Sequence, residues 1–285
     1  MDIQKIISEM TLEEKTALLS GKDFWHLKGV ERLGIPEIMV TDGPHGLRKQ
    51  AGTSDHLGLN ASVPATAFPT AAATACSFDR DLIYEMGEAL GEMCQQEDVA
   101  VILGPGTNIK RSPLCGRNFE YFSEDPYLAG EMAAALILGV QSKNVGTSVK
   151  HFAMNNQETR RMSVSVLADE RTKREIYLAP FETAIKKGKP WTVMCSYNKI
   201  GGVYSSENRR LLNDLLRGEW GFEGMVTTDW YTHAPQYTEI AAGNDVKMGC
   251  GAPEHTLRMM QEGKLSREDV KTSTRRLLEM ILKLA

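Results

Sequence analysis

The chain has 285 residues, 42% hydrophobic and 25% charged, which is enough to bury one large core within the size range of a single α/β barrel. Its formal net charge is −4 and no basic stripe interleaved with aromatic residues is present, which argues against nucleic acid or a membrane as partner. No stretch approaches the roughly 18 apolar residues of a membrane span. Composition therefore favours a soluble protein that binds a small neutral molecule.

Cysteine usage and the N-terminus indicate a reducing compartment. The five cysteines form an odd set with no close pair, so we expect neither a disulfide framework nor a zinc site. The start, Met1-Asp2-Ile3-Gln4, lacks the basic and apolar segments of a targeting signal. We expect a cytoplasmic protein that needs no metal and no other cofactor.

Short strand-like runs alternate with helical periods along the chain. Thr11 and Glu14 form a capping box that predicts the first helix. In chain order, the expected elements are a helix over 11–19, a strand over 37–41, a weaker strand candidate over 65–68, a helix over 81–95, a strand over 99–103, a helix over 126–140, a strand over 145–149, a helix over 170–187, a strand over 191–196, a helix over 208–217, strands over 224–228 and 245–248, and helices over 253–262 and 266–284.

This alternation implies parallel strands covered by helices, and the near-continuous apolar runs fit strands that are buried on both faces. A doubly wound sheet and a closed barrel both satisfy the pattern. The segments 50–63 and 107–123 lack periodicity and are too long for ordinary connections, so we expect them to be active-site loops.

Polar or aromatic residues follow the ends of several predicted strands: Asp42, Lys150 and His151, Tyr197, and Asp229 with Trp230. Each has a purely structural alternative, since an Asp after a strand often caps a helix, and an exposed Arg117–Glu120 pair contributes under about 1 kcal/mol. In a barrel, however, these strand ends converge on one face, where barrel enzymes keep their sites. Carboxylates, basic groups and an aromatic side chain together suit a neutral sugar. Neither a phosphate-binding glycine loop nor a metal-spaced His/Cys cluster is present.

At these residues the sequence resembles glycoside hydrolase family 3 over nearly its whole length. The matching strings are TDGPHGLR from Thr41, CGRNFEYFSEDPYLAG from Cys115, VKHFAMNNQE from Val149, VMCSYNKIGG from Val193 and WGFEGMVTTDWY from Trp220. The resemblance implies a TIM-type (β/α)8-like barrel. With only about seven strand candidates, we expect it to be irregular around the second strand, near 65–68, and around the eighth, near Cys250.

The resemblance also implies roles for individual residues. Asp229 matches the family's catalytic nucleophile. Residues matching those that bind the sugar before the cleaved bond, or that lie beside the nucleophile, are Asp42, Arg48, Arg117, Lys150, His151, Met194, Tyr197 and Trp230. Glu120 and Glu158 are expected to support Arg117 or Lys150.

The family's retaining mechanism needs two carboxyl groups about 5 to 5.5 Å apart. In the β-glucosidase branch the acid/base Glu belongs to a second α/β domain after the barrel, and nothing here resembles it. A barrel-only branch uses a His in a Pro-Gly-His-Gly loop, which 153–158 lacks. We therefore expect residues 1–285 to be a single barrel domain, with the usual C-terminal acid/base domain absent.

Three functions remain open from the sequence. The first is a retaining β-glucosidase barrel that binds a β-glucoside or glucose-like molecule, with weak or absent hydrolysis. The second is a non-catalytic sugar-binding fragment or one subunit of a split glycosidase, with a second chain or self-association covering the exposed barrel face. The third, a Schiff-base lyase on Lys150, requires a lowered lysine pKa.

Overall fold

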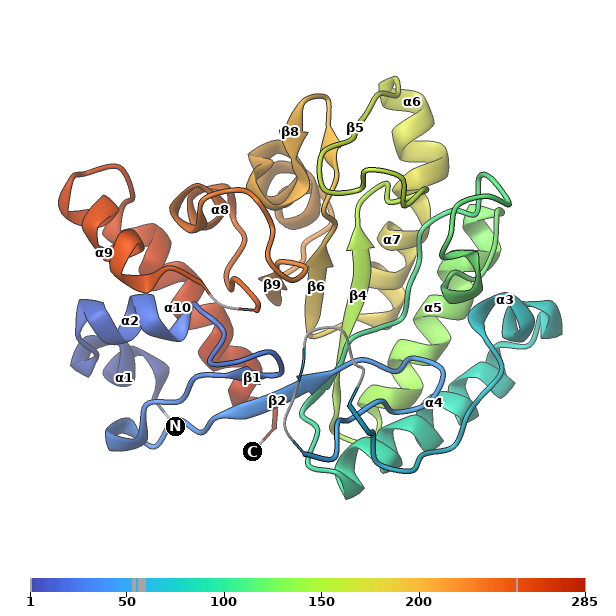
Figure 1. The fold of residues 1–285 in the computed structure, drawn as a ribbon, viewed down its shortest axis with the longest axis horizontal. Coiled ribbons are helices and arrows are strands. Elements are labelled where there is room, and N and C mark those ends of the chain that lie inside the picture. Colours follow the sequence, from blue (N-terminus) through green and yellow to red (C-terminus); the bar gives the residue numbers. More distant parts are fainter. Residues whose placement is uncertain (1, 53–54, 56–59, 250, 285) are drawn as a thin grey trace.

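The computed structural model describes residues 2–52, 55, 60–249 and 251–284. A curled sheet occupies the centre, and helices surround it on the outside (Figure 1). Its strand order is β1-β2-β3-β4-β6-β9, with β1 antiparallel to β2 and all other neighbours parallel. The strands are β1 (His26–Leu27), β2 (Ile38–Thr41), β3 (Val101–Ile102), β4 (Gly146–Phe152), β6 (Thr192–Cys195) and β9 (Met225–Thr227).

Single bridges close this sheet into a ring. Thr227 of β9 pairs with Val246, and the neighbouring Lys247 pairs with Ser20. Gly21 then pairs with Leu27 of β1, which returns the ring to its other edge. The result is an irregular barrel in which the run predicted over 245–248 contributes single bridges in place of a full strand. Cys250 lies outside the described residues.

The helices lie outside the ring: α1 (Ile3–Glu9), α2 (Leu12–Leu18), α3 (Ala71–Thr74), α4 (Arg80–Gln96), α5 (Pro126–Gln141), α6 (Glu170–Thr172), α7 (Ala179–Thr183), α8 (Gln236–Ala242), α9 (Pro253–Gln261) and α10 (Arg267–Leu282). Short 3-10 segments are η1 (Glu31–Leu33), η2 (Ala75–Ser77), η3 (Asn118–Glu120) and η6 (Ser205–Glu207). Segments of π-helix are η4 (Lys173–Tyr177), η5 (Ala184–Gly188) and η7 (Arg210–Glu219). Within the described residues, no helix is both long and apolar enough to span a membrane.

Buried apolar residues explain why the central elements form. Every residue of β4 is buried, as expected for a parallel strand covered on both faces. Helix α5 begins at Pro126, where the Asp125 carboxylate accepts the N–H groups of Tyr127 and Leu128, and almost its whole length is buried between α4 and α7. A second core packs α1, α2, α9 and α10 against the other side of the ring.

The sequence predictions for the elements are mostly confirmed. The capping box of Thr11 and Glu14 is present, and both side chains accept the expected N–H groups. The helix predicted over 170–187 is wrong as a single α-helix, because Pro180 cannot supply the N–H that continues an α-helical ladder.

The strand candidate over 65–68 is also wrong. That segment lies between Pro64 and Pro69 and forms no regular element. Its Phe68 N–H donates to the His45 carbonyl. A small sheet of β5 (Ser165–Val166), β7 (Lys199–Ile200) and β8 (Val203–Tyr204) was not predicted. Its hairpin turn is Gly201-Gly202, both with positive φ, a signal that the sequence did carry.

Candidate active site

The strand ends bring the predicted polar residues together. Asp42 directly follows β2, Lys150 and His151 lie in the second half of β4, and Asp229 comes two residues after β9. The loop 107–123 reaches the same place because Asn108 binds the His151 backbone: its amide group accepts the His151 N–H at 2.9 Å and donates to the His151 carbonyl at 3.0 Å. This loop brings Arg117 and Glu120 beside Lys150 and His151.

Lys150 is buried between two carboxylates. Its Nζ donates to Asp42 Oδ1 at 2.9 Å and lies 3.0 Å from Glu120 Oε1. Burial alone would lower the Lys150 pKa, but Asp42 and Glu120 outweigh it and hold the pKa above its usual value. Burial alone would raise the Glu120 pKa, but the charges of Lys150 and Arg117 outweigh burial and lower that pKa. A permanently cationic lysine argues against the Schiff-base alternative, which needs the opposite shift.

Arg117 connects this pair to His151. Its Nε donates to Glu120 Oε2 at 2.8 Å, and its Nη2 lies 3.0 Å from His151 Nε2. Burial and the Arg117 charge lower the His151 pKa well below its usual value, so the imidazole is neutral. The 3.8 Å between His151 Nε2 and Asp229 Oδ2 is therefore a close approach and not an ion pair.

Asp229 is held by uncharged donors. The Trp230 N–H donates to Asp229 Oδ1 at 2.8 Å, and the Tyr197 hydroxyl donates to the same carboxylate. Burial raises the Asp229 pKa, and the opposing effects of Arg117, the Trp230 amide, Lys150 and Tyr197 do not cancel that rise. By contrast with these uncharged donors, three neighbouring carboxylates, Asp42, Glu120 and Glu158, each lie within 3.0 Å of a Lys or Arg nitrogen.

Trp230 forms an aromatic wall beside Asp229. Its indole N–H donates to the Phe24 carbonyl at 2.7 Å, and its ring centroid lies 5.6 Å from that of Trp25. The Trp25 indole N–H donates to Gln50 at 3.0 Å, which fixes the pair. An immobilised indole next to a carboxylate suits stacking on one face of a sugar ring.

Three predicted residues occupy less direct positions. Arg48 pairs with Asp42 through the backbone, since its N–H donates to the Asp42 carbonyl at 3.0 Å, but its side chain is exposed. Met194 is buried in β6, in register with Thr227 of β9, two residues before Asp229. Glu158 accepts from Arg161 at 2.9 Å and lies 3.7 Å from Arg117, so it contacts the cluster from its outer side.

Sequence reasoning missed four residues of this cluster. Arg161 lies over the Tyr197 ring, with its guanidinium carbon 4.7 Å from the ring centroid. Tyr121 and Asn155 link His151 to Glu158, and Asn108 anchors the loop. Tyr121 and Asn155 fall inside strings already recognised, but a buried tyrosine beside Phe122 has the pattern of a core residue. Nothing in the sequence around Arg161 marks it.

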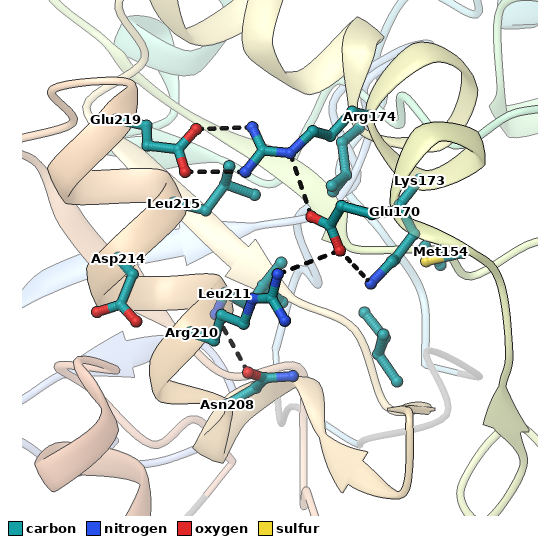
Figure 2. A pocket seen from close by; sticks show the side chains of 12 residues that line it. Met154, Glu170, Lys173, Arg174, Asn208, Arg210, Leu211, Asp214, Leu215 and Glu219 are labelled. Carbon is teal, nitrogen blue, oxygen red and sulfur yellow. Dashed lines mark hydrogen bonds and ion pairs between the residues drawn. The ribbon is translucent and has the colours of Figure 1, made fainter.

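A separate hollow of about 140 Å³ lies between η4 and η7, and its lining includes Met154, two residues after β4 (Figure 2). Its basic rim residues are paired: Glu170 contacts Lys173, Arg174 and Arg210, and Arg174 also binds Glu219 through two hydrogen bonds. The described part of the chain contains no group of three or more His, Cys, Asp or Glu side chains arranged to hold a metal ion.

Comparison with known families decides the assignment. The family described as the N terminal domain of glycosyl hydrolase family 3 matches residues 12–280. The chain belongs to glycosyl hydrolase family 3. Among curated relatives, thermostable β-glucosidase B of Acetivibrio thermocellus is 56% identical over 284 residues, covering 99% of this chain and 38% of that protein. An exo-α-(1→6)-L-arabinopyranosidase of Bifidobacterium longum is also 56% identical, covering 85% of this chain and 32% of that protein.

Solved structures of this family confirm the barrel fold. The β-glucosidase 3B of Thermotoga neapolitana, in complex with α-D-glucose, superposes with a TM-score of 0.94 at 40% identity, covering 99% of this chain and 43% of that one. A family 3 β-glucosidase of Bifidobacterium adolescentis gives a TM-score of 0.92 at 49% identity, covering 98% of this chain and 40% of that one. This family 3 chain therefore spans less than half the length of these relatives.

Proposed function

We propose that this chain is the catalytic barrel of a retaining β-glucosidase in which Asp229 attacks the anomeric carbon of a β-glucoside. The observation that supports this role is the difference between Asp229 and its neighbours. Asp42, Glu120 and Glu158 are committed to Lys or Arg partners, whereas Asp229 accepts from the Trp230 amide and the Tyr197 hydroxyl. A carboxylate without a bound cation keeps its nucleophilic electron pairs available.

The surrounding residues suit the hydroxyls of the sugar. The Asp42 side chain is 43% exposed although it binds Lys150, so one face of its carboxylate is open to accept hydroxyl hydrogens. We assign hydroxyl binding to Asp42, Arg48, Arg117, Lys150 and His151, contacts beside the nucleophile to Met194 and Tyr197, and stacking to Trp230. Glu120 and Glu158 support this set by fixing Lys150, Arg117 and Arg161.

The proton donor is expected to come from outside the barrel. A retaining mechanism needs a second carboxyl group that is protonated before the first step. Glu120 is unsuited, because Lys150 and Arg117 lower its pKa, and Glu158 is bound by Arg161 and Asn155. We propose that residues 1–285 form one barrel domain whose hydrolysis is weak or absent unless a part outside these residues supplies the acid/base group. The alternative is a non-catalytic sugar-binding fragment or a subunit of a split glycosidase.

A second substrate class has equal support from identity. The arabinopyranosidase relative is as similar as the β-glucosidase relative, at 56%. The two sugars differ in the hydroxymethyl group of glucose and in hydroxyl stereochemistry. Substrate choice therefore depends on contacts that the overall identity does not reveal, and both sugars belong in the test.

The test is covalent trapping of Asp229. The chain is incubated with dinitrophenyl 2-deoxy-2-fluoro-β-D-glucoside, or with the matching fluorinated arabinopyranoside, and analysed by mass spectrometry after digestion. We expect the label on the peptide that contains Asp229. A label on Glu120 or Glu158 would overturn the assignment. Calorimetric binding of a glucose-like iminosugar without any label would instead identify the sugar-binding alternative.

A further inference from the structure

Five residues of the site form a closed ring of contacts. Arg117 Nη2 lies 3.0 Å from His151 Nε2, and His151 Nδ1 lies 3.0 Å from the Tyr121 hydroxyl. The Asn155 amide nitrogen donates to the Tyr121 oxygen at 3.2 Å and to Glu158 Oε1 at 2.9 Å. Glu158 closes the ring at 3.7 Å from Arg117 Nη1. Because Tyr121, His151 and Asn155 are all buried, water does not compete for these bonds.

The donors and acceptors of this ring fix the position of the imidazole proton. A guanidinium only donates, so His151 Nε2 must accept from Arg117. A neutral imidazole then carries its hydrogen on Nδ1 and donates it to Tyr121. The reverse assignment, with the Tyr121 hydroxyl donating to Nδ1, would leave neither nitrogen of the imidazole with a hydrogen. The two hydrogens of the Asn155 amide are matched by its two acceptors, Tyr121 and Glu158.

We infer that Tyr121, held by Asn155, is a positioning residue that keeps His151 in the Nδ1–H tautomer with Nε2 turned to Arg117. This inference rests on the proposed function of the site. The consequence is that His151 donates no hydrogen bond to Asp229, although Nε2 lies only 3.8 Å from its carboxylate. Arg117 stays beside His151, and the Asp229 carboxylate keeps the Trp230 and Tyr197 donors described above.

Removal of the Tyr121 hydroxyl should release this arrangement. In Tyr121→Phe the buried Nδ1–H would have no acceptor, which is costly for a buried donor. The Nε2–H tautomer then becomes favourable, because Nε2 can turn its hydrogen toward Asp229. That change displaces Arg117 from Nε2, since two donors cannot face each other. The sugar site thus loses the orientation of Arg117 and gains an unwanted hydrogen bond to Asp229.

The experiment reads the tautomer directly. Long-range proton–nitrogen NMR spectra of the chain with 15N-labelled histidine distinguish protonated from unprotonated ring nitrogens, and His151→Gln assigns the signal. We expect an Nδ1–H tautomer in the parent chain and an Nε2–H or mixed population in Tyr121→Phe. Calorimetry with deoxynojirimycin, a glucose-like iminosugar, should show binding about tenfold weaker in Tyr121→Phe, tenfold being about 1.4 kcal/mol.

Matched controls separate this positioning role from a nonspecific effect of the substitution on folding. Tyr127→Phe removes the same hydroxyl from a side chain that is 68% exposed, and should leave tautomer and affinity unchanged. Asn155→Ala leaves the Tyr121 hydroxyl in place but removes the bond that holds it, and should raise the share of the Nε2–H tautomer; an unchanged tautomer there would contradict the inference even if Tyr121→Phe fails to fold. An Nε2–H or doubly protonated His151 in the parent chain would overturn the inference, as would a Tyr121→Phe variant identical to it. If NMR shows the expected tautomer but calorimetry shows no iminosugar binding, the result would count against the proposed function and not against the tautomer.

Discussion

Lys150 Nζ lies 3.0 Å from Glu120 Oε1, and both residues are almost completely buried. The same ammonium donates to Asp42 at 2.9 Å, and Arg117 binds the other oxygen of Glu120. Each charge is therefore paired, and loss of one partner would leave a buried charge short of its compensation. The proposed sugar site depends on this pair, because Glu120 fixes the Lys150 side chain between Asp42 and the loop that carries Arg117.

Glu120→Gln should consequently destabilise the fold. The variant keeps the shape of the side chain but removes the charge shared by Lys150 and Arg117, and we expect a loss of about 2 to 3 kcal/mol in the free energy of unfolding. Urea unfolding measures this loss. The control is Glu175→Gln, which removes half of an exposed Arg171–Glu175 pair and should change little. Equal effects of the two substitutions would contradict the prediction.

His151 should make stability depend on pH. Its pKa is lowered in the fold by burial and by Arg117, so the unfolded chain binds this proton more readily. The stabilisation is complete above the unfolded pKa of about 6.5 and is lost as pH falls toward the folded pKa, by at most about 1.4 kcal/mol per pH unit. Unfolding free energies from pH 7 to pH 5 should fall more steeply for the parent chain than for His151→Gln. Parallel curves would show that His151 does not contribute.

Asp42→Ala should weaken sugar binding. Hydrogen bonds to charged groups contribute roughly 1.5 to 3 kcal/mol each, so the affinity for a glucose-like iminosugar should fall by at least about tenfold. Calorimetric titration of parent and variant measures the change. Asp214→Ala removes an exposed aspartate from η7, away from the strand ends, and should bind like the parent. Unchanged affinity in Asp42→Ala would exclude Asp42 from the site.

Asp229→Asn should abolish covalent labelling without harming the fold. Asn is nearly isosteric but lacks a carboxylate nucleophile. Burial raises the Asp229 pKa. Protonated Asp229 therefore contributes to the free energy of unfolding at low pH, and this contribution is lost as pH rises through the folded pKa. At pH 7 the uncharged Asn variant should therefore be at least as stable as the parent in urea unfolding. Labelling by an activated aryl glucoside at the parent rate would refute the nucleophile assignment.

The sequence revealed the strand-end residues because parallel strands of a barrel all end on the same face. Asp42, Lys150 and Asp229 could be grouped without knowing the intervening structure. Tyr121 and Arg161 could not be placed by periodicity, since their positions depend on how two loops return to β4 and on hydrogen bonds such as those of Asn108.

Two of the element errors share one cause. The run over 65–68 is apolar like a strand, and 170–187 is periodic like a helix, yet proline decides both. Pro64 and Pro69 bound the first, and Pro180 interrupts the hydrogen bonds of the second. Apolar pattern predicts burial, but the backbone donors determine which regular element can form.

Glu120 and Glu158 are both bound to cations, and this predicts how the proposed reaction should stall in the described barrel. General acid–base catalysis typically contributes about 10²- to 10⁴-fold, and it matters most when the leaving group is a sugar hydroxyl. The chain alone should therefore cleave cellobiose negligibly. A dinitrophenol leaves readily without protonation, so attack by Asp229 can still proceed on a dinitrophenyl β-glucoside.

The second step should then be slow, because Glu120 and Glu158 are bound to cations and the open face of Asp42 is assigned to the sugar hydroxyls, so none of these carboxylates is available to remove a proton from the attacking water. A glycosyl-enzyme on Asp229 should accumulate, and azide or formate should release it faster, since an anionic nucleophile needs no general base. Mass spectrometry after incubation with dinitrophenyl β-glucoside, with and without azide, measures both effects. Brisk cellobiose hydrolysis by the chain alone would show that a residue of the barrel acts as the acid, and Glu120→Gln and Glu158→Gln would then identify which carboxyl group supplies the proton.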